Sequence, residues 1–538
     1  MSAADLIVIA DTVHTLDPAG PPAQAVAIAD GLIVALGERR DAAGWTGPHT
    51  QVVDLGPAVL TPGLVDGHIH PVFGIDLTTG IDLSPARTLD QLRSLVRTAA
   101  ERLGPDDWFQ GYGLDPNAFG DTPVTAEPLI EVLADRPALV MMFDAHSAVA
   151  TPAALARAGI TGPCAFDGGA SIVCDADGVP TGHLLEIPAY QPVRDVLPAQ
   201  TAARRRARFV EILTGMAATG ITAGNVMDFA DDSADLVAAA ERDGELPIRL
   251  RFAPFCMPGA TRAELDHIAA EQGRGGRRWQ VEGVKFFIDG TVDGGTAWLE
   301  HADSHGESRH PFWPDPAEYS AAIKHLAGLG VPTVTHSIGD RGTRYVLGAL
   351  SGLPVGRVPH RVEHVETLPA ELVARFAEQG VVASMQPLHC TRFTRGDRTD
   401  NWSQRLGRAR AERAWCARDL HEAGAVVALG SDWPIGPYDA RWVLADAQLR
   451  RRWDRPEDTP IVPTQALTPA MALAGYTTHA ARANGLADRS GTIGVGKRAD
   501  LTAFTVDPLT APPDELAVAP IALTAVAGDI VHHDPAAG

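Results

Sequence analysis

The chain has 538 residues, of which 45% are hydrophobic and 21% charged, a composition typical of a globular protein with two or three domains. Its formal net charge of −22 argues against nucleic acid or a membrane surface as a partner and predicts an acidic, soluble surface. The 5 cysteines form no CxxC pair, and no stretch approaches the roughly 20 apolar residues of a membrane span. We therefore expect a cytoplasmic protein with reduced thiols whose partner is a small-molecule substrate.

Both ends of the chain have the pattern of short β-strands. Apolar runs at 5–11, 25–29 and 32–36 are separated by turns, and Asp30-Gly31 is a strong hairpin signal. Residues 491–504 and 521–532 repeat this strand-and-turn pattern near the C-terminus. We predict that residues 1–57 and 486–538 join in one small β-sandwich domain beside a larger central domain.

The central part alternates between strand and helix patterns, which is the signature of a parallel sheet with crossover helices. Helical patterns fill most of the gaps, for example at 369–379 and 409–424. Eight strands are predicted. The first ends at His68 and His70, and the other seven span 221–228, 247–255, 284–289, 331–336, 360–365, 381–386 and 426–432. This count predicts an α/β fold with a TIM (β/α)8 barrel over residues 58–485, whose active site lies at the C-terminal ends of the strands.

The gap after the first predicted strand is far too long for a single crossover. We therefore expect an insertion at about residues 75–200, with an apolar run at 138–144 and a Gly/Asp-rich stretch at 167–182. Insertions on the catalytic face commonly form a substrate lid. The arginine-rich run at 204–208 is expected to be a solvated helix face, with an anion site as the alternative.

The first predicted strand ends in a His-x-His motif. His68 and His70 stand at i and i+2, so both imidazoles point to the same side of a strand. Two neutral imidazoles are a natural half-site for a metal such as zinc. Taken alone, the motif is also consistent with two surface histidines that bind no metal.

Lys285 lies in an otherwise apolar strand, where an unpaired ammonium is costly. One interpretation is an ion pair with Asp289 or Asp293. The other is a neutral amine that reacts with CO2 to form a carbamate, an anion able to bridge two metals as a carboxylate does.

Three more polar residues occupy predicted strand ends, namely His336, His364 and Asp432. Taken singly, each histidine fits a hydrogen-bonded core residue, and the aspartate fits a helix cap. Together with His68, His70 and Lys285 they provide enough ligands for one or two metals at the face where a TIM barrel keeps its chemistry.

The ordered set of motifs resembles the amidohydrolase superfamily, and within it the YtcJ-like branch called amidohydrolase family 3, which includes N-substituted formamide deformylase. The resemblance covers nearly the whole chain. It departs from the branch pattern at Gly224–Asp228 and at Ala145, where glycine is usual. The motifs are Asp66-Gly-His-Ile-His70, Asp144-Ala-His-Ser147, Gly178-Val-Pro-Thr-Gly-His-Leu-Leu-Glu186, Val284-Lys-Phe-Phe-Ile-Asp-Gly290, His336-Ser-Ile-Gly-Asp340, Arg361-Val-Glu-His364, Gly430-Ser-Asp-Trp-Pro434 and Gly496-Lys-Arg-Ala-Asp-Leu501.

The resemblance implies roles for the individual residues. Asp432 takes a proton from water and passes it to the leaving amine, while His364 or His146 polarises the carbonyl. A divalent metal, expected to be zinc, is held by His68, His70, His336, His364 and Asp432, with carboxylated Lys285 as the bridge if there are two ions. Manganese, iron and cobalt use the same ligands. Glu363 and Asp340 are expected to orient the ligands, and the expected substrate contacts are Asp144, Trp298, Gln386, His389 and Trp433.

The resulting prediction is a metal-dependent hydrolase that cleaves a non-peptide C–N bond, in a linear amide or an N-formyl or N-acyl amine. Two alternatives stay open: a deaminase or cyclic amidohydrolase acting on a heterocycle, and a non-catalytic small-molecule-binding protein on the same fold. A homodimer is a further expectation.

Overall fold

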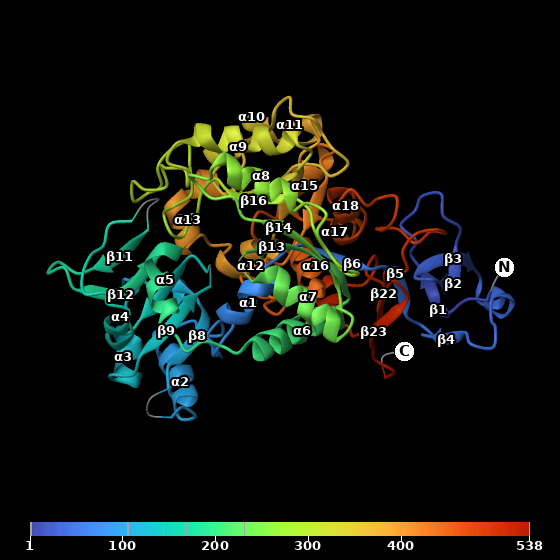
Figure 1. Cartoon of the computed structure of the whole chain (residues 1–538), viewed down its shortest axis with the longest axis horizontal. Coiled ribbons are helices and arrows are strands. Elements are labelled where there is room, and N and C mark those ends of the chain that lie inside the picture. Colours follow the sequence, from blue (N-terminus) through green and yellow to red (C-terminus); the bar gives the residue numbers. More distant parts are fainter. Residues whose placement is uncertain (1–2, 105–106, 144, 167–169, 231, 537–538) are drawn as a thin grey trace.

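The computed structural model describes residues 3–104, 107–143, 145–166, 170–230 and 232–536. Figure 1 shows a sheet built from both chain ends at one side of the molecule and the sheet of the long insertion at the other, with the central strands and helices between them. No helix of the described ranges is both long and apolar enough to cross a bilayer.

The two ends of the chain share one eight-stranded sheet, in the order β23-β22-β21-β5-β1-β2-β3 with β4 paired to β1. The predicted hairpin turn at Asp30-Gly31 is confirmed, because both residues have positive φ (51° and 74°) between paired strands. The predicted packing of these strands as a two-layer sandwich stays a prediction. The strands are β1 (Leu6–Val13), β2 (Ala23–Ala29), β3 (Leu32–Gly37), β4 (Gln51–Asp54), β5 (Val59–Pro62), β21 (Leu501–Phe504), β22 (Ile521–Val526) and β23 (Asp529–His533), with a 3-10 turn η1 (Arg39–Gly44).

The centre contains two wholly parallel sheets, and each of the eight predicted central strands contains a strand of one of them. One sheet has the order β15-β14-β13-β6, from β6 (Leu64–Ile69), β13 (Ile221–Phe229), β14 (Arg249–Pro254) and β15 (Trp279–Val281). The other runs β16 (Val284–Phe287), β17 (Thr333–Ser337), β18 (Arg361–His364), β19 (Val382–Met385) and β20 (Val427–Leu429). The parallel bridge Ile69–Trp433 connects β6 to the chain just after β20, and the parallel bridge Phe255–Lys285 connects the end of β14 to β16.

Helices follow the central strands and bury their apolar faces against them. The predicted single helix at 409–424 is wrong: two short helices, α14 and α15, stand there, because Trp415 between them takes a φ of +48° that no helix allows. The predicted helix at 369–379 begins with a 3-10 turn, η3 (Ala370–Leu372). The helices are α1 (Pro71–Leu77), α6 (Ala202–Ala218), α7 (Ser233–Asp243), α8 (Arg262–Ala270), α9 (Pro316–Gly328), α10 (Asp340–Leu350), α11 (Val373–Gln379), α12 (Pro387–Phe393), α13 (Asn401–Leu406), α14 (Arg408–Ala411), α15 (Ala417–Glu422), α16 (Ala440–Leu449), α17 (Pro469–Tyr476), α18 (Thr478–Ala483) and α19 (Pro513–Val518), with η4 (Pro463–Gln465).

The segment between β6 and β13 forms a six-stranded mixed sheet of its own, in the order β11-β12-β10-β9-β8-β7. The predicted apolar run there forms β9, in the middle of the sheet. The strands are β7 (Ile81–Asp82), β8 (Phe109–Leu114), β9 (Ala138–Met142), β10 (Ser147–Ala150), β11 (Ser171–Cys174) and β12 (Pro180–Leu185), with α2 (Leu89–Ala100), η2 (Pro116–Phe119), α3 (Glu127–Leu133), α4 (Pro152–Arg157) and α5 (Ile187–Asp195) around them.

Candidate metal centre

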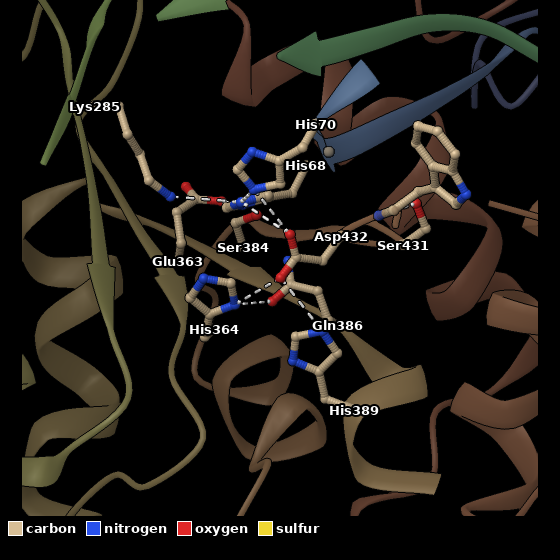
Figure 2. A network of polar contacts seen from close by, with 12 residues as sticks. His68, His70, Lys285, Glu363, His364, Ser384, Gln386, His389, Ser431 and Asp432 are labelled. Atoms are coloured by element: carbon tan, nitrogen blue, oxygen red, sulfur yellow. Dashed lines mark hydrogen bonds and ion pairs between the residues drawn. The ribbon is translucent and has the colours of Figure 1, made fainter. Parts of the chain in front are cut away.

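Close packing of β6 against β20 brings the His-x-His motif next to Asp432. A Cβ on Gly67 would lie 2.6 Å from the carbonyl oxygen of Leu429, so glycine is required at this approach of the two strands. The backbone N–H of Asp432 donates to the carbonyl of His68 (2.8 Å), and that of His70 donates to the carbonyl of Trp433 (2.8 Å). These bonds fix the strand ends that carry the polar cluster in Figure 2.

Three ligand-type atoms form a nearly equilateral triangle. His68 Nε2 lies 3.3 Å from His70 Nε2 and 3.4 Å from Asp432 Oδ1, and His70 Nε2 lies 3.1 Å from the same oxygen. Ligands bound to one tetrahedral zinc at 2.0–2.1 Å stand roughly 3.3 Å apart. Asp432 Oδ1 is buried and accepts no hydrogen bond from the described residues, so its lone pairs are directed at this triangle. The donor set therefore fits a divalent ion.

His364 and His336 continue the cluster. Ligand atoms of His68, His364 and Asp432 all lie within 4.8 Å of one another, and the rings of His336 and His364 are 4.4 Å apart between centroids. His364 Nδ1 is 2.9 Å from Gln386 Oε1, and His336 Nε2 is 3.2 Å from the carbonyl of Gly290. Burial lowers the pKa of His68, His336 and His364 well below the ordinary value, so these imidazoles are neutral, as a ligand must be.

Lys285 is buried beside the triangle, with Nζ 3.5 Å from His68 Nε2. Burial lowers the pKa of its amine to about 8. The described carboxylates include none within ion-pair distance of Nζ. Asp289, one of the two partners considered from the sequence, instead accepts the backbone N–H groups of Trp298, Ile338 and Gly339. The environment of Lys285 therefore favours the neutral amine more than water does and provides no carboxylate as a close ion-pair partner among the described residues.

The backbone is strained at two strand ends of the cluster. His364 has a φ of 74° and Asp432 a φ of 57°, in the left-handed region that side chains other than glycine seldom adopt. Burial raises the pKa of the Asp432 carboxyl, but the neighbouring imidazoles of His68 and His70 outweigh it and hold that pKa well below the ordinary value. Backbone strain such as the positive φ of His364 and Asp432 concentrates at functional sites.

The insertion contributes a histidine to the same site. His146, between β9 and β10, has its ring centroid 5.8 Å from that of His336, and its Nδ1 lies 2.8 Å from Glu186 Oε2. Glu186 itself has a φ of 65°, another strained position at the site. The carboxylate orients the imidazole, and His146 lines the cavity.

The other residues predicted from the sequence fall in different places. His389 lines the site, with Nε2 3.4 Å from Asp432 Oδ2, whereas Gln386 holds His364 instead of lining the cavity. Trp433 packs against Gly74 and the ring of Tyr438 and is buried in the core.

Trp298 packs against Tyr345, with the Arg341 guanidinium over its ring, so neither predicted tryptophan lines the cavity. The Asp340 carboxylate accepts the backbone N–H groups of Glu300 and Arg341 on the surface and does not orient a ligand imidazole. Asp144 lies outside the described residues.

Glu363 is placed as predicted, and the sequence reasoning missed its partner Arg361. Glu363 Oε2 lies 2.7 Å from His68 Nδ1, and Arg361 contacts both carboxylate oxygens at 3.0 Å. The alternation of Arg361 and Glu363 along one strand face was an available signal, since such residues share a side. Asp66, which accepts the N–H groups of His68 and Ser431, was missed too.

A cavity of about 490 Å³ opens in front of the cluster. Its walls are mostly apolar and come from the central strands, α1, α5, α12 and the insertion. The cluster residues on its wall are His70, His146, Lys285, His336, His364, His389 and Asp432.

Residues 51–532 match the model of the amidohydrolase family, and the chain belongs to this family. It is 27% identical over 535 residues to the protein YtcJ of Bacillus subtilis, covering 97% of this chain and 98% of that one. It is 26% identical over 535 residues to N-substituted formamide deformylase of Arthrobacter pascens, covering 95% of each. Its fold resembles that of a metal-dependent hydrolase of Pyrococcus horikoshii, with a TM-score of 0.72 and 22% identity over 94% of this chain and 99% of that one.

Proposed function

We propose that the protein is a metal-dependent hydrolase that cleaves a non-peptide C–N bond, in a linear amide or an N-formyl or N-acyl amine. The observation that carries the proposal is the triangle of His68, His70 and Asp432, with Lys285, His336 and His364 around it, at the floor of a substrate-sized cavity. Family membership and the likeness to a formamide deformylase support this reaction class.

The proposal includes the architecture predicted from the sequence. We propose that the two parallel sheets close into a (β/α)8 barrel over residues 58–485, with a sandwich domain from residues 1–57 and 486–538 and an insertion at about 75–200. The bridges Ile69–Trp433 and Phe255–Lys285 support closure, because the first joins β6 to the end of β20 and the second joins the end of β14 to β16. In this arrangement His68, His70, His336, His364 and Asp432 lie at or just after the C-terminal ends of strands, while Lys285 is the second residue of β16.

A divalent ion, zinc in the first instance, would be held by His68, His70 and Asp432, with His336 and His364 completing one site or forming a second. Carboxylated Lys285 would bridge two ions. When bound, such an ion supplies Lewis acidity toward water and toward the amide carbonyl.

The protein's own residues then direct the proton transfers. Asp432 accepts the proton of the attacking water and delivers it to the amine nitrogen as the C–N bond breaks, so that amide plus water becomes carboxylic acid plus amine. His146, as an imidazolium whose Nδ1–H is held by the Glu186 carboxylate, donates a hydrogen bond from its other ring nitrogen to the developing oxyanion. The apolar walls limit the access of bulk water to the reacting groups.

The test is product analysis with protein reconstituted with zinc, manganese or cobalt and a panel of N-formyl and N-acyl amines and aminated heterocycles. The proposal expects a carboxylic acid and an amine in equal amounts, and none from protein treated with a chelator. Release of ammonia from heterocycles alone would assign a deaminase instead. Binding without any turnover would assign a non-catalytic binding protein.

A further inference from the structure

The residues of the cavity separate into an aromatic wall beside the polar cluster and a set of charged groups near the outer end. The aromatic wall consists of Phe73, Phe255 and Phe287, whose neighbouring ring centroids are 5.7 Å apart. This wall adjoins the metal ligands directly: Phe73 stacks on His70 at 6.2 Å, and Phe287 lies 5.5 Å from His336. A ring attached to a scissile amide at the cluster would therefore meet aromatic faces on this side.

A second aromatic contact lies beside His389. Phe143, from the end of β9, stacks on Phe393 of α12 at 3.8 Å between centroids, and Phe393 is 6.0 Å from the His389 ring. At the cavity mouth the apolar side chains of Ile187 and Met257 are 41% and 44% exposed. Apolar side chains thus line part of the cavity from its mouth to the polar cluster.

The cations of the outer wall already have carboxylate partners. Arg205 Nη1 contacts both oxygens of Asp76, at 2.9 and 2.7 Å, and Arg194 Nη2 lies 3.9 Å from the same carboxylate. These three residues also line a neighbouring cavity of about 640 Å³, so the ion pair stands at the border between two hollows. The guanidinium groups that could receive an anionic substrate are therefore engaged by Asp76.

The acidic groups of the inner wall are engaged in the same way. Glu366 accepts the indole N–H of Trp402 at 2.8 Å and lies 3.4 Å from His389 Nδ1. Asp293 accepts from the amide of Asn401 at 2.9 Å. Apart from the groups of the polar cluster, the described wall holds one mostly exposed carboxylate, that of Asp232 (62% exposed), which lies 3.7 Å from Arg205 Nη2.

From these contacts we propose that the enzyme selects uncharged amides that carry an aromatic or bulky apolar group, and that Asp76, together with Asp232, sets this selectivity by offsetting the charges of Arg194 and Arg205. This inference rests on the proposed hydrolysis and names its substrate class. A carboxylate on the substrate would lose its hydration in the cavity without gaining a partner, which disfavours it.

The experiment compares two amides of nearly equal size, N-(4-methylbenzyl)formamide and N-(4-carboxybenzyl)formamide. The wild type is expected to hydrolyse the methyl compound with a kcat/KM at least about 10-fold higher. Asp76→Asn removes the carboxylate that both arginines contact and leaves only Asp232, 3.7 Å from Arg205, and it is expected to narrow the ratio of the two kcat/KM values about 10-fold. Asp90→Asn, an aspartate on α2 that also pairs with an arginine but lies outside the cavity wall, is expected to leave the ratio unchanged.

A second variant covers the case in which Asp76→Asn does not fold. Ile187→Arg adds a cation at the exposed lip without removing a polar contact, and the ratio is expected to move in the same direction. Equal rates for the two amides in the wild type, or a ratio that neither variant changes, would overturn the inference.

Binding separates this inference from the reaction itself. Calorimetry with both amides and Asp432→Asn protein measures the preference of the cavity without turnover. If the wild type hydrolyses neither amide but the methyl compound alone binds, the proposed reaction fails and the selectivity stands. If both bind equally, the selectivity fails whatever the reaction.

Discussion

Arg361 and Glu363 form a buried, two-pronged ion pair directly behind His68. Nε of Arg361 lies 3.0 Å from Oε1 of Glu363 and Nη2 lies 3.0 Å from Oε2, while Oε2 is also 2.7 Å from His68 Nδ1. Arg361 Nη2 donates in addition to the carbonyl of Gly67, at 2.7 Å. The carboxylate keeps the proton of His68 on Nδ1, which leaves the Nε2 lone pair facing Asp432.

Glu363→Gln should therefore lower metal affinity by about 10- to 100-fold, because an amide is a weaker acceptor for the His68 N–H and leaves Arg361 unpaired. Glu378→Gln, on the exposed face of α11, is the matched control and should bind metal like the wild type. Competition with a chromogenic chelator measures the metal affinity of both variants. If Glu363→Gln binds metal as tightly as the wild type, this carboxylate does not orient His68 for metal binding.

Lys285→Ala should lose most of the activity, and the way it is rescued should reveal what the lysine supplies. If Lys285 acts as a carbamate, added propionate restores part of kcat/KM, because a small carboxylate can occupy the vacated space. If it acts as a cation, ethylammonium restores activity instead. Lys324→Ala, an exposed lysine on α9, is the control and should match the wild type with either additive.

His146→Ala should lower kcat by about 100- to 1,000-fold, the usual effect of removing one oxyanion donor, and leave metal content unchanged. Glu186→Gln should reproduce part of this loss, since it weakens the contact that orients His146. Steady-state kinetics and metal analysis on the same samples provide both readings. Loss of metal from His146→Ala would make it a ligand and contradict the assigned role.

The buried position of Trp433 predicts that replacing two helical glycines by alanine changes the free energy of unfolding in opposite directions. A Cβ on Gly74 would lie 2.0 Å from Trp433 Cζ3, so Gly74→Ala should destabilise the protein by about 1–3 kcal/mol through overpacking. Gly348 on α10 has open space at its Cβ position, so Gly348→Ala should stabilise it by roughly 0.5–1 kcal/mol. Urea unfolding measures both. Equal effects would mean that Trp433 is free to move.

The sequence was informative wherever function depends on the period of a strand. His68 and His70 share a face because they are two residues apart. His336, His364 and Asp432 stand at the ends of runs that form parallel strands, and Lys285 lies inside such a strand. Parallel strands end at the same edge, so the polar residues that follow them meet there. This reasoning predicted which residues would form the cluster.

The sequence was uninformative wherever a side chain's direction depends on distant packing. Trp433 directly follows Asp432, yet its ring points away from the cavity and fills the space above Gly74. The contact between Glu186 and His146 depends on the fold of the insertion, and that between Asp76 and Arg205 joins helices 129 residues apart in the chain. No local pattern predicts such contacts.

The central claim is that the cluster at His68, His70 and Asp432 binds a divalent metal, and metal content per chain tests it most directly. It is measured on the purified protein together with intact mass under native, non-acidic conditions, and on His70→Ala as the comparison. The account predicts one or two divalent ions per wild-type chain, with the added mass of one CO2 if Lys285 bridges two, and a marked loss of metal in His70→Ala. A folded wild-type protein that binds no metal even after reconstitution with zinc, manganese, iron or cobalt would contradict it.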